Sequence, residues 1–355
     1  MIKSKKIGVL GGGQLGRMSA LAAARLGIST HIFCPEENCP ASLVTPFFTK
    51  ADYTDETALA QFAEQVDVIT YEFENIPLQT IEFLQTKKTV YPSAKLLEVS
   101  QNRIAEKAFL NEIGILTAPW APATAPEDIA TTLGKWGMTD CIIKTTRFGY
   151  DGKGQIFHHE NDSVEKSWSA LNTNEAIIEG VIDFNYEVSI IIARDLKGQM
   201  AVYPPTENDH KNHILDKTHY PSPLTKDLQI EAAAMVRKLA EAVDLVGILT
   251  LELFLTKDGK LLANEIAPRT HNSGHWTINA CSISQFENHI RCVSGLPVGD
   301  PAPHSHATMI NLIGDDINHL DKHLNMPNAH IHLYGKTEAR GGRKMGHVTI
   351  LNNNK

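Results

Sequence analysis

The stretch KTTRFGYDGKGQ, residues 144–155, combines groups that could bind and cover a phosphate. It holds three glycines, two lysines, an arginine, a tyrosine and an aspartate. Lysine and arginine side chains bind phosphate, and glycine lets a backbone approach a ligand or move over it. An apolar run, Cys141–Ile143, precedes the stretch and places Lys144 at the end of a strand. The pattern predicts a flexible flap over the phosphates of a nucleoside triphosphate.

Two acidic side chains in the second half of the chain could hold a divalent metal. Glu252 in LTLELFL and Glu265 in LLANEIAPR lie on the two strands of a hairpin predicted around Asp258-Gly259. The hairpin brings the two acids near one another, although periodicity does not fix the register. Either acid could simply face solvent, but Glu252 interrupts an apolar strand, where an unpaired charge is costly. Together with Asn264, the pair favours Mg²⁺ (or Mn²⁺), because Mg²⁺ binds proteins through one or two carboxylates and substrate phosphates.

The glycine turn GGGQLG, Gly11–Gly16, matches G-x-G-x-x-G between a predicted strand and a predicted helix. Three readings stay open from the motif: a tight turn without a ligand, a site for a monophosphate or another anion, and a site for NAD or FAD. A dinucleotide enzyme also needs an acidic residue at the end of the second strand. Cys34-Pro35 occupies that place, with Glu36 and Glu37 slightly late, so the dinucleotide reading is weak.

The pair His271 and His275 in HNSGH has the spacing of helical zinc ligands. That spacing brings two histidines together on a helix, whereas Pro268 and Gly274 favour a loop here. The sequence has no H-E-x-x-H motif, so we do not predict zinc.

The overall composition is that of a soluble cytoplasmic protein. The 355 residues are 42% hydrophobic and 21% charged, with a net charge of −8, which does not favour nucleic acid as a partner. The five cysteines form no Cys-x-x-Cys pair and are expected to be free thiols in a reducing compartment. The apolar stretch Leu245–Leu255 is too short to span a membrane, and the N-terminus does not fit a signal peptide.

Hydrophobic periodicity predicts an α/β protein with a change of architecture along the chain. Strands and helices alternate over the first hundred residues, which indicates a doubly wound parallel sheet. The strands are expected at residues 7–10, 30–34, 67–73 and 89–92, and the helices at 18–26, 55–66 and within 74–87. A domain boundary is expected near 93–101 and a helix over 100–114. Short strands between 140 and 205 indicate an antiparallel sheet, followed by a helix over 225–247, the hairpin, and a strand-loop-strand over 330–351.

Taken together, these segments resemble the ATP-grasp superfamily. The resemblance is carried by KTTRFGYDGKGQ, IIEGVIDFNYEVSIIIAR and LELFLTKDGKLLANEIAPRTHNSGHWT. It is closest to the N5-carboxyaminoimidazole ribonucleotide synthetase family, because GVLGGGQLGRM, TYEFENIP, APRTHNSGHWT and ARGGRKMGH also occur in order. The implied architecture is a Rossmann-like pre-ATP-grasp domain over 1–99, an ATP-grasp domain over 100–295 with a lid around 144–190, and a β-rich domain over 296–355. A homodimer is also implied.

The implied reaction consumes ATP and bicarbonate. Carboxyphosphate forms and its carbon dioxide passes to the exocyclic amine of 5-aminoimidazole ribonucleotide in purine synthesis. Phosphoryl transfer of this kind needs alignment and charge neutralisation more than covalent help from the protein.

The resemblance also implies which residues bind the nucleotide. Arg103, Lys144 and Lys153 would hold phosphates, and Glu252 and Glu265 the metal, with Asn264 beside them. The flap would be formed by Gly149, Tyr150, Asp151, Gly152, Lys153, Gly154 and Gln155. Adenosine would be held by Glu179, Gly180, Val181, Ile182 and Glu187, with His210 near the nucleotide.

The ribonucleotide is implied to bind at the glycine turn. Gln14 and Glu72 would line its site, and Lys336 and Arg343 would contact its phosphate. Tyr150 and Asp151 would orient its amine between the two substrates. The reacting centre, near bicarbonate or carboxyphosphate, would be lined by Arg269, His271, Asn272, Ser273 and His275.

Two departures from the family pattern affect rates rather than the assignment. FCPEENCPA replaces a stretch that more often carries an early acid, and Phe148 stands where a smaller residue is commoner. The alternatives are a sister ATP-grasp enzyme, such as formate-dependent glycinamide ribonucleotide transformylase or biotin carboxylase, an NAD-dependent dehydrogenase, and a non-catalytic nucleotide-binding module. The dehydrogenase explains only the glycine turn, and a module would be expected to lose Glu252 and Glu265.

Overall fold

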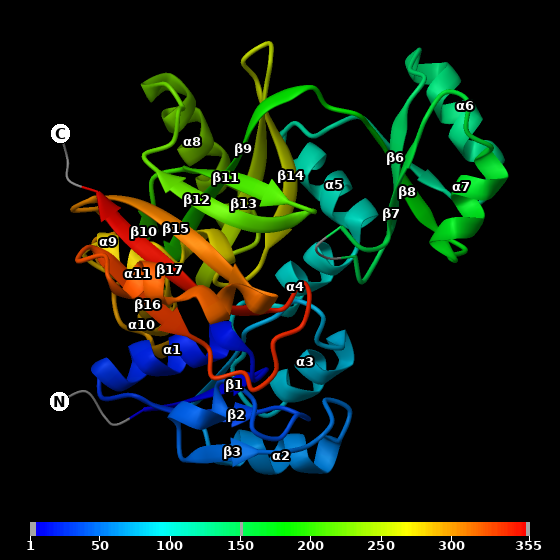
Figure 1. Ribbon diagram of the computed structural model, residues 1–355. Coiled ribbons are helices and arrows are strands. Elements are labelled where there is room, and N and C mark those ends of the chain that lie inside the picture. Colours follow the sequence, from blue (N-terminus) through cyan, green and yellow to red (C-terminus); the bar gives the residue numbers. More distant parts are fainter. Residues whose placement is uncertain (1–4, 150–151, 353–355) are drawn as a thin grey trace.

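The computed structural model describes residues 5–149 and 152–352, and their strands form three sheets (Figure 1). In the view of Figure 1, the N-terminal sheet lies at the bottom, the lid sheet at the upper right and the large sheet at the upper left. Helices α4 and α5 lie where the three meet. The predicted combination of a parallel N-terminal sheet with antiparallel sheets is confirmed. Within the described residues, no helix is long and apolar enough to cross a membrane.

The N-terminal sheet is parallel and has the order β3-β2-β1-β4, which is the predicted doubly wound arrangement. Its elements are β1 (Lys6–Leu10), α1 (Gln14–Arg25), β2 (Ser29–Phe33), η1 (Ser42–Val44), β3 (Phe47–Thr49), α2 (Glu56–Glu64), β4 (Val68–Tyr71) and α3 (Leu78–Gln85). The carboxyl ends of β1 and β4 are neighbours, so the glycine turn after β1 lies beside the residues that follow β4.

Three predicted details of this part were wrong. Helix α1 begins at Gln14 rather than at Met18, because Gly13 is already its N-cap residue. Strand β3 was not predicted, since three residues are too few to show a periodicity. The strand predicted over 89–92 makes only a single bridge, between Ile69 and Val90.

Two helices, α4 (Ala94–Gln101) and α5 (Arg103–Glu112), connect the N-terminal sheet to the rest. The prediction of one helix over 100–114 was therefore wrong at its start. Asn102 has an extended backbone between the two helices, and its side chain accepts hydrogen bonds from the first amides of α5. Such a cap stabilises a helix start. The Arg103 amide donates to the Thr146 carbonyl at 2.9 Å, which holds the start of α5 against the flap segment.

The lid sheet is antiparallel, in the order β5-β8-β6-β7. Its elements are β5 (Trp120–Ala123), α6 (Glu127–Trp136), β6 (Cys141–Thr145), β7 (Gln155–His158), α7 (Val164–Leu171) and β8 (Ala176–Gly180). Helices α6 and α7 pack on one face of the sheet and share with it a separate hydrophobic core that includes Ile129, Leu133 and Ile143. Figure 1 shows this unit standing apart from the rest of the molecule.

The large sheet has the order β14-β13-β9-β11-β12-β15-β17-β16, and β10 pairs with β9. Its strands are β9 (Phe184–Arg194), β10 (Met200–Val202), β11 (Thr206–Lys211), β12 (Ile214–Tyr220), β13 (Gly247–Thr256), β14 (Leu261–Ala267), β15 (His306–Ile313), β16 (Ala329–Leu333) and β17 (Lys344–Asn352). The remaining helices are α8 (Lys226–Ala242), η2 (Asn272–Gly274), α9 (Thr277–Ala280), α10 (Gln285–Ser294), η3 (Gly314–His319) and α11 (Asp321–Leu324).

Alternate residues of β9 explain how the large sheet is covered. Ile190 and Ile192 share a core with α8, whereas Ile191 and Ala193 share a different core with α10. Side chains of a strand alternate between faces, so α8 and α10 cover opposite faces. The apolar run of β9 is thus the signature of a strand buried on both sides.

The strands between 140 and 205 do not form the single antiparallel sheet that was predicted. Strands β6, β7 and β8 belong to the lid sheet, and β9 and β10 to the large sheet. Residues 181–183 connect the two. The C-terminal region is rich in strands, as expected. Its strand β15 pairs with β12, so the C-terminal strands extend the large sheet. The short HNSGH segment, expected as a loop, includes the 3-10 helix η2.

Because the lid has its own core, we expect that core to lose stability independently of the rest. Ile129→Ala removes a fully buried side chain of the lid core, at a cost of about 2–5 kcal/mol. Hydrogen exchange should accelerate in peptides from 120–180 and stay unchanged in the N-terminal sheet. Thr131→Ala, at an exposed position of the same helix, is the matched control. Uniform acceleration along the whole chain would contradict an independently stable lid.

Candidate active site

The two predicted metal carboxylates are direct neighbours on β13 and β14. Glu252 pairs with Glu265, which confirms that the hairpin brings them together. On the far side of Glu252, Leu253 pairs with Ala263, so Asn264 is the extra residue of a β-bulge. Two residues of β14 therefore oppose Glu252. Bulges near active sites re-aim side chains in this way.

Each carboxylate of the pair has a basic side chain beside it. His271 Nε2 lies 2.9 Å from Glu252 Oε1, and Arg103 Nη1 lies 3.4 Å from Glu265 Oε2. Burial opposes ionisation of Glu252, but His271 outweighs it and holds the pKa of this carboxyl below its usual value. Adjacent ionised oxygen donors fit Mg²⁺. In the part of the chain that the structure describes, no cluster of three or more such ligands occurs, so substrate oxygens and water would complete the shell.

Behind the flap, one buried carboxylate is held between two lysines. Glu179 Oε2 accepts a hydrogen bond from Lys144 Nζ at 2.8 Å, and Lys107 Nζ lies 3.7 Å from Oε1. Burial disfavours the charge of Glu179, but Lys144 and then Lys107 outweigh it and bring the pKa to about 2. Burial lowers the pKa of Lys107, which is 1% exposed. The side chain of Glu179 thus balances the charge of the two lysines, while its backbone pairs with β5 and β6 in the lid sheet.

The flap segment is anchored at both of its described ends. Arg103 Nη2 donates to the Gly149 carbonyl at 3.4 Å, and the Thr145 amide donates to the Gly154 carbonyl at 2.8 Å. Gly152 and Gly154 have φ of +77° and +70°, which glycine adopts without strain. Gln155 opens β7. The predictions for Tyr150 and Asp151 fall on residues outside the described ranges.

The segment after β8 leads from the lid to the large sheet. Glu179 and Gly180 end β8, and Val181 and Ile182 follow it, with Val181 exposed. On the next strands, Glu187 Oε2 lies 3.0 Å from His210 Nδ1. Burial disfavours the charged imidazole, but Glu187 outweighs it and raises the pKa of His210. The predicted adenosine residues therefore run from the end of the lid sheet into the large sheet, where Glu187 and His210 form a pair.

The loop after β14 is tied to the N-terminal sheet by an ion pair. Arg269 Nη2 donates to Glu74 Oε1 at 2.8 Å, and its Nε donates to the other carboxylate oxygen. Burial opposes ionisation of Glu74, but Arg269 outweighs it and holds the pKa at about 2. A bidentate pair of this kind fixes orientation as well as distance. Arg269 thereby places the predicted reacting centre beside the residues that follow β4.

His271 and Ser273 form a buried chain behind the carboxylates. His271 Nδ1 lies 2.8 Å from Ser273 Oγ, which in turn lies 2.7 Å from Ser189 Oγ. Ser273 is fully buried, so it supports His271 rather than facing a substrate. Asn272 differs, because neither its Oδ1 nor its Nδ2 has a partner within residues 5–149 and 152–352, although both atoms are buried. An unpaired buried amide is costly, so Asn272 is the residue of this loop best suited to bind a ligand.

His275 lies deeper than the sequence led us to expect. It is 1% exposed, and its ring lies 4.7 Å from the ring of His347 and 5.6 Å from that of Phe286. Burial lowers the pKa of His275 well below its usual value. A neutral, packed imidazole supports the loop, so any contribution of His275 to the reacting centre would be indirect.

The glycine turn at the start of α1 is filled by the protein's own carboxylate. Glu72 Oε1 accepts from the Gly13 amide at 2.5 Å and Oε2 from the Gly16 amide at 2.9 Å. A Cβ on Gly11 would lie 2.4 Å from Glu72 Cγ, so the turn closes on this side chain. A dinucleotide pyrophosphate would need the same amides. The turn is therefore an anchor for Glu72, and Gln14 lies half-buried beside it.

The loop between β16 and β17 supplies positive charge on the same side. Lys336 Nζ donates to the Lys344 carbonyl at 2.7 Å, and Arg343 Nη1 donates to the Glu338 carbonyl at 3.0 Å. Burial and then Arg343 lower the pKa of Lys336 to about 8, while Glu72 acts in the opposite direction. Glu72 and Lys336 are therefore electrostatic neighbours despite their separation in sequence.

Several site residues were missed by the sequence reasoning. Lys107 follows Arg103 by one helical turn, and that i, i+4 spacing on α5 could have revealed it. Glu74 lies inside the quoted TYEFENIP. Gln285 is fully buried, accepts from the His271 amide at 2.9 Å and donates to the His271 carbonyl at 2.6 Å. No sequence pattern marks Gln285, because its role depends on packing between distant segments.

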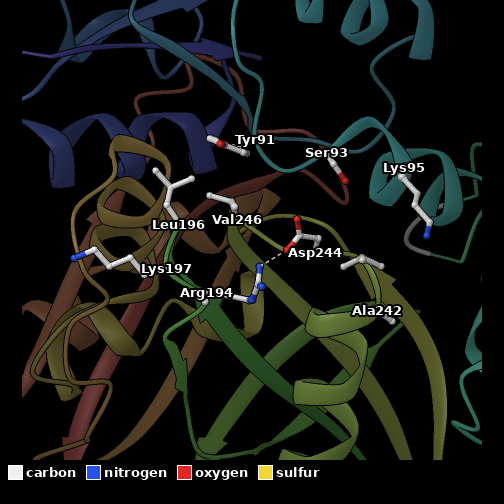
Figure 2. Close-up of a pocket in the computed structure, with 11 residues that line it drawn as sticks. Tyr91, Ser93, Lys95, Arg194, Leu196, Lys197, Ala242, Asp244 and Val246 are labelled. Atoms are coloured by element: carbon white, nitrogen blue, oxygen red, sulfur yellow. Dashed lines mark hydrogen bonds and ion pairs between the residues drawn. The ribbon is translucent and has the colours of Figure 1, made fainter.

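A cavity of about 650 Å³ lies apart from these residues (Figure 2). It is bordered by Tyr91, by Lys95 of α4 and by Leu196 in the turn between β9 and β10. Arg194 Nη1 donates to Asp244 Oδ1 at 2.7 Å, an interaction drawn in Figure 2. No predicted site residue is among the described residues that line it, so the cavity does not belong to the candidate active site.

Comparison with known proteins identifies the class to which this fold and site belong. Residues 4–101 match the ribonucleotide synthetase preATP-grasp domain, residues 108–286 the ATP-grasp domain, and residues 307–355 the phosphoribosylaminoimidazole carboxylase C-terminal domain. The molecule is thus an ATP-grasp ligase. The N5-carboxyaminoimidazole ribonucleotide synthase of Brucella melitensis is 49% identical over 97% of this chain and 96% of its own length. The chain belongs to the N5-carboxyaminoimidazole ribonucleotide synthase family.

Solved structures show the same relationship. The N5-carboxyaminoimidazole synthetase of Staphylococcus aureus complexed with ADP has a TM-score of 0.94 and 36% identity, covering 100% of this chain and 95% of that chain. The Aspergillus clavatus enzyme in complex with ADP and 5-aminoimidazole ribonucleotide has a TM-score of 0.92 and 30% identity, covering 99% and 95%.

The unpaired amide of Asn272 yields a prediction that separates binding from stability. Asn272→Ala loses no hydrogen bond within the described residues, so thermal stability should not fall. If the amide binds a charged reacting group, kcat/KM should fall roughly 10- to 100-fold. Asn279→Ala is the control, because Asn279 Oδ1 lies 2.8 Å from His332 Nε2 and its loss should lower the melting temperature. A destabilised Asn272→Ala protein with normal kcat/KM would give Asn272 a purely structural role.

Proposed function

We infer that this chain carboxylates 5-aminoimidazole ribonucleotide to N5-carboxyaminoimidazole ribonucleotide at the expense of ATP, a step of purine biosynthesis that releases ADP and phosphate. The inference rests on full-length similarity to enzymes of that name and on the fold shared with the Aspergillus clavatus complex. The observation that carries it is the juxtaposition of Glu252 and Glu265 on paired strands, in a protein whose buried Lys144 is held by Glu179. Bicarbonate would be the carboxyl source.

At the nucleotide end, Lys144, Lys153 and Arg103 would neutralise the phosphates. The buried Lys107 and Glu179 hold Lys144 in place, because Glu179 pairs with both lysines. The backbone of residues 180–182 would face the adenine, and Glu187 with His210 would lie beside the ribose. Gly149–Gln155 would close over the phosphates.

Glu252 and Glu265 would hold Mg²⁺, which supplies neutralisation of phosphate charge when bound. The carboxylates themselves are prepared for this, because His271 keeps Glu252 ionised and Arg103 lies beside Glu265. The bulge at Asn264 gives the pair two successive side chains opposite Glu252.

The carboxyl group would be transferred beside the loop after β14. A bicarbonate oxygen bonds to the γ-phosphorus as the bond to ADP breaks, and the resulting carboxyphosphate loses phosphate to give carbon dioxide. The exocyclic amine then attacks the carbon and releases a proton. We assign Asn272 and Arg269 to holding the carboxyl group, and Asp151 and Tyr150, outside the described residues, to orienting the amine.

The ribonucleotide would lie between the glycine turn and the β16–β17 loop. Glu72 and Gln14 would face its ribose, and Lys336 and Arg343 its phosphate. Lys336 is suited to this, because its amine is near Glu72. Its pKa of about 8 lets the amine gain or lose a proton near neutral pH. The homodimeric state stays a prediction from the resemblance, and the cytoplasmic location a prediction from the sequence composition.

The rival functions fit the site less well. The dehydrogenase reading needs the amides of Gly13 and Gly16 for a dinucleotide, and Glu72 already accepts from both. A non-catalytic nucleotide-binding module has no use for paired acids, yet Glu252 and Glu265 are adjacent. A sister ATP-grasp enzyme would share the nucleotide end and differ in the second substrate.

The function is tested by measuring ADP release with Mg²⁺ and bicarbonate, with and without 5-aminoimidazole ribonucleotide. We expect strong stimulation by the ribonucleotide. ADP release that does not respond to the ribonucleotide would retain the ATP-grasp site and discard the second substrate. Glycinamide ribonucleotide with formate serves as the control substrate for a sister enzyme.

Removing one metal carboxylate should stop this reaction without unfolding the protein. Glu265→Gln keeps the shape of the side chain but loses the charge that would hold Mg²⁺, so ADP release should fall to background while the melting temperature stays near that of the native protein. Glu231→Gln, an exposed position on α8, is the charge-matched control. Native rates of ADP release in Glu265→Gln would remove the metal role from this residue.

The pKa of Lys336 predicts how ribonucleotide use depends on pH. Its pKa is lowered to about 8, so the amine is charged below that pH and loses its proton as the pH rises through it. The kcat/KM for the ribonucleotide should therefore decline above pH 8, whereas the KM for ATP should not follow the same curve. Lys336→Arg should flatten the decline, because a guanidinium stays charged. An unchanged ribonucleotide KM in Lys336→Ala would move the phosphate site elsewhere.

A further inference from the structure

Two thiols meet beneath the glycine turn, in the stretch FCPEENCPA. A Cβ on Gly12 would lie 2.9 Å from Cys34 Sγ and 2.2 Å from Cys39 Sγ, so both sulfur atoms lie against the same glycine. Cys34 directly follows β2, and Cys39 lies in the loop before η1. Both residues are buried, at 5% and 3% exposed. The missing side chain of Gly12 leaves the space in which the two sulfurs meet.

Cys39 differs chemically from the other cysteines, including Cys34, whose pKa is raised by its contact with Cys39 and by burial. Cys34, through a hydrogen bond between the two side chains, lowers the pKa of the Cys39 thiol to about 6, against the opposing effect of burial. Burial raises the pKa of Cys141 and of Cys292 to about 12. The thiolate is the reactive form of cysteine, so Cys39 is the residue of this set that can react at neutral pH.

The residues next to each cysteine hold the glycine turn in place. The Gly11 amide donates to the Phe33 carbonyl at 2.9 Å, immediately before the first cysteine. The Ala41 amide donates to the Gly12 carbonyl at 2.9 Å, two residues after the second. A bond between the sulfurs would draw these two anchors together, because a disulfide needs an S–S separation of about 2.05 Å.

We propose that Cys34 and Cys39 form a modification site at which a peroxide converts the dithiol to a disulfide, and that the disulfide weakens use of the ribonucleotide at the glycine turn. The second part rests on the proposed function, because it takes the glycine turn as the ribonucleotide site. A peroxide is the fitting oxidant, since a molecule near the size of water can reach thiols that are almost fully buried.

The reaction balances in two steps. The Cys39 thiolate attacks one oxygen of hydrogen peroxide, the O–O bond breaks, and hydroxide leaves to give a sulfenic acid. The Cys34 sulfur attacks the Cys39 sulfur, the S–O bond breaks, and the departing hydroxide takes the thiol proton as water. Two thiols are oxidised by two electrons in total, and the peroxide is reduced to two waters. A dithiol reductant reverses the modification.

The test treats the reduced full-length protein with hydrogen peroxide and removes the oxidant with catalase. Free thiols are alkylated, the protein is digested without reduction, and mass spectrometry searches for the peptide linked through Cys34 and Cys39. The KM values for ribonucleotide and ATP are measured before oxidation, after it, and after dithiothreitol. Cys39→Ser cannot form the link, and Cys141→Ser, a buried cysteine of the lid core, is the matched control that still can.

We expect the linked peptide in the native protein and in Cys141→Ser, with a rise of about fivefold or more in the ribonucleotide KM, reversal by dithiothreitol and an unchanged KM for ATP. Absence of the linked peptide, or a linked protein with an unchanged ribonucleotide KM, would overturn the proposal. Detection of the peptide does not depend on activity. If the reduced protein shows no ribonucleotide-stimulated ADP release, the proposed function fails, and the linked peptide still decides whether the modification site exists.

Discussion

The ion pair between Arg269 and Glu74 is the constraint on which the site depends. It joins the loop after β14, which belongs to the large sheet, to the residues that follow β4 of the N-terminal sheet. Both partners are largely buried and meet through two hydrogen bonds, so the contact fixes direction as well as distance. If a nucleotide binds at Glu252 and Glu265 and a second substrate at the glycine turn, as proposed, the two can face each other only while these parts keep this arrangement.

Charge is balanced locally throughout the site. Glu179 is flanked by Lys107 and Lys144, and Glu252 by His271. A buried charge without a partner is costly. Removing one partner of such a set leaves the other charge buried and unpaired, which destabilises the protein. The same requirement explains why the glycine turn holds Glu72: burial raises the pKa of this carboxyl, and the backbone amides at the helix start offset part of that effect. Glu179 and Glu252 are therefore paired within the protein itself.

Local patterns predicted most of the elements, and they failed where a boundary depends on packing. The hairpin around Asp258-Gly259 and the helix after Thr225 follow from turn chemistry and periodicity, and both are present. The break at Asn102 was missed, because the residues on each side are good helix formers and only the capping geometry separates them. The division of the middle strands between two sheets was also missed, since strand pairing over long separations leaves no periodic signal.

The sequence by itself indicated the class of protein through its resemblance to a known family, and residue type and short spacing predicted the pair of acids and the glycine turn. Only the tertiary structure decided that Asn264 is a bulge residue, that Lys107 supports Glu179, and that the Asn272 amide has no partner among the described residues. Each of these depends on strand register or burial, which arise when segments far apart in the chain pack together. A side chain's neighbours, rather than its identity, set its charge and its availability to a ligand.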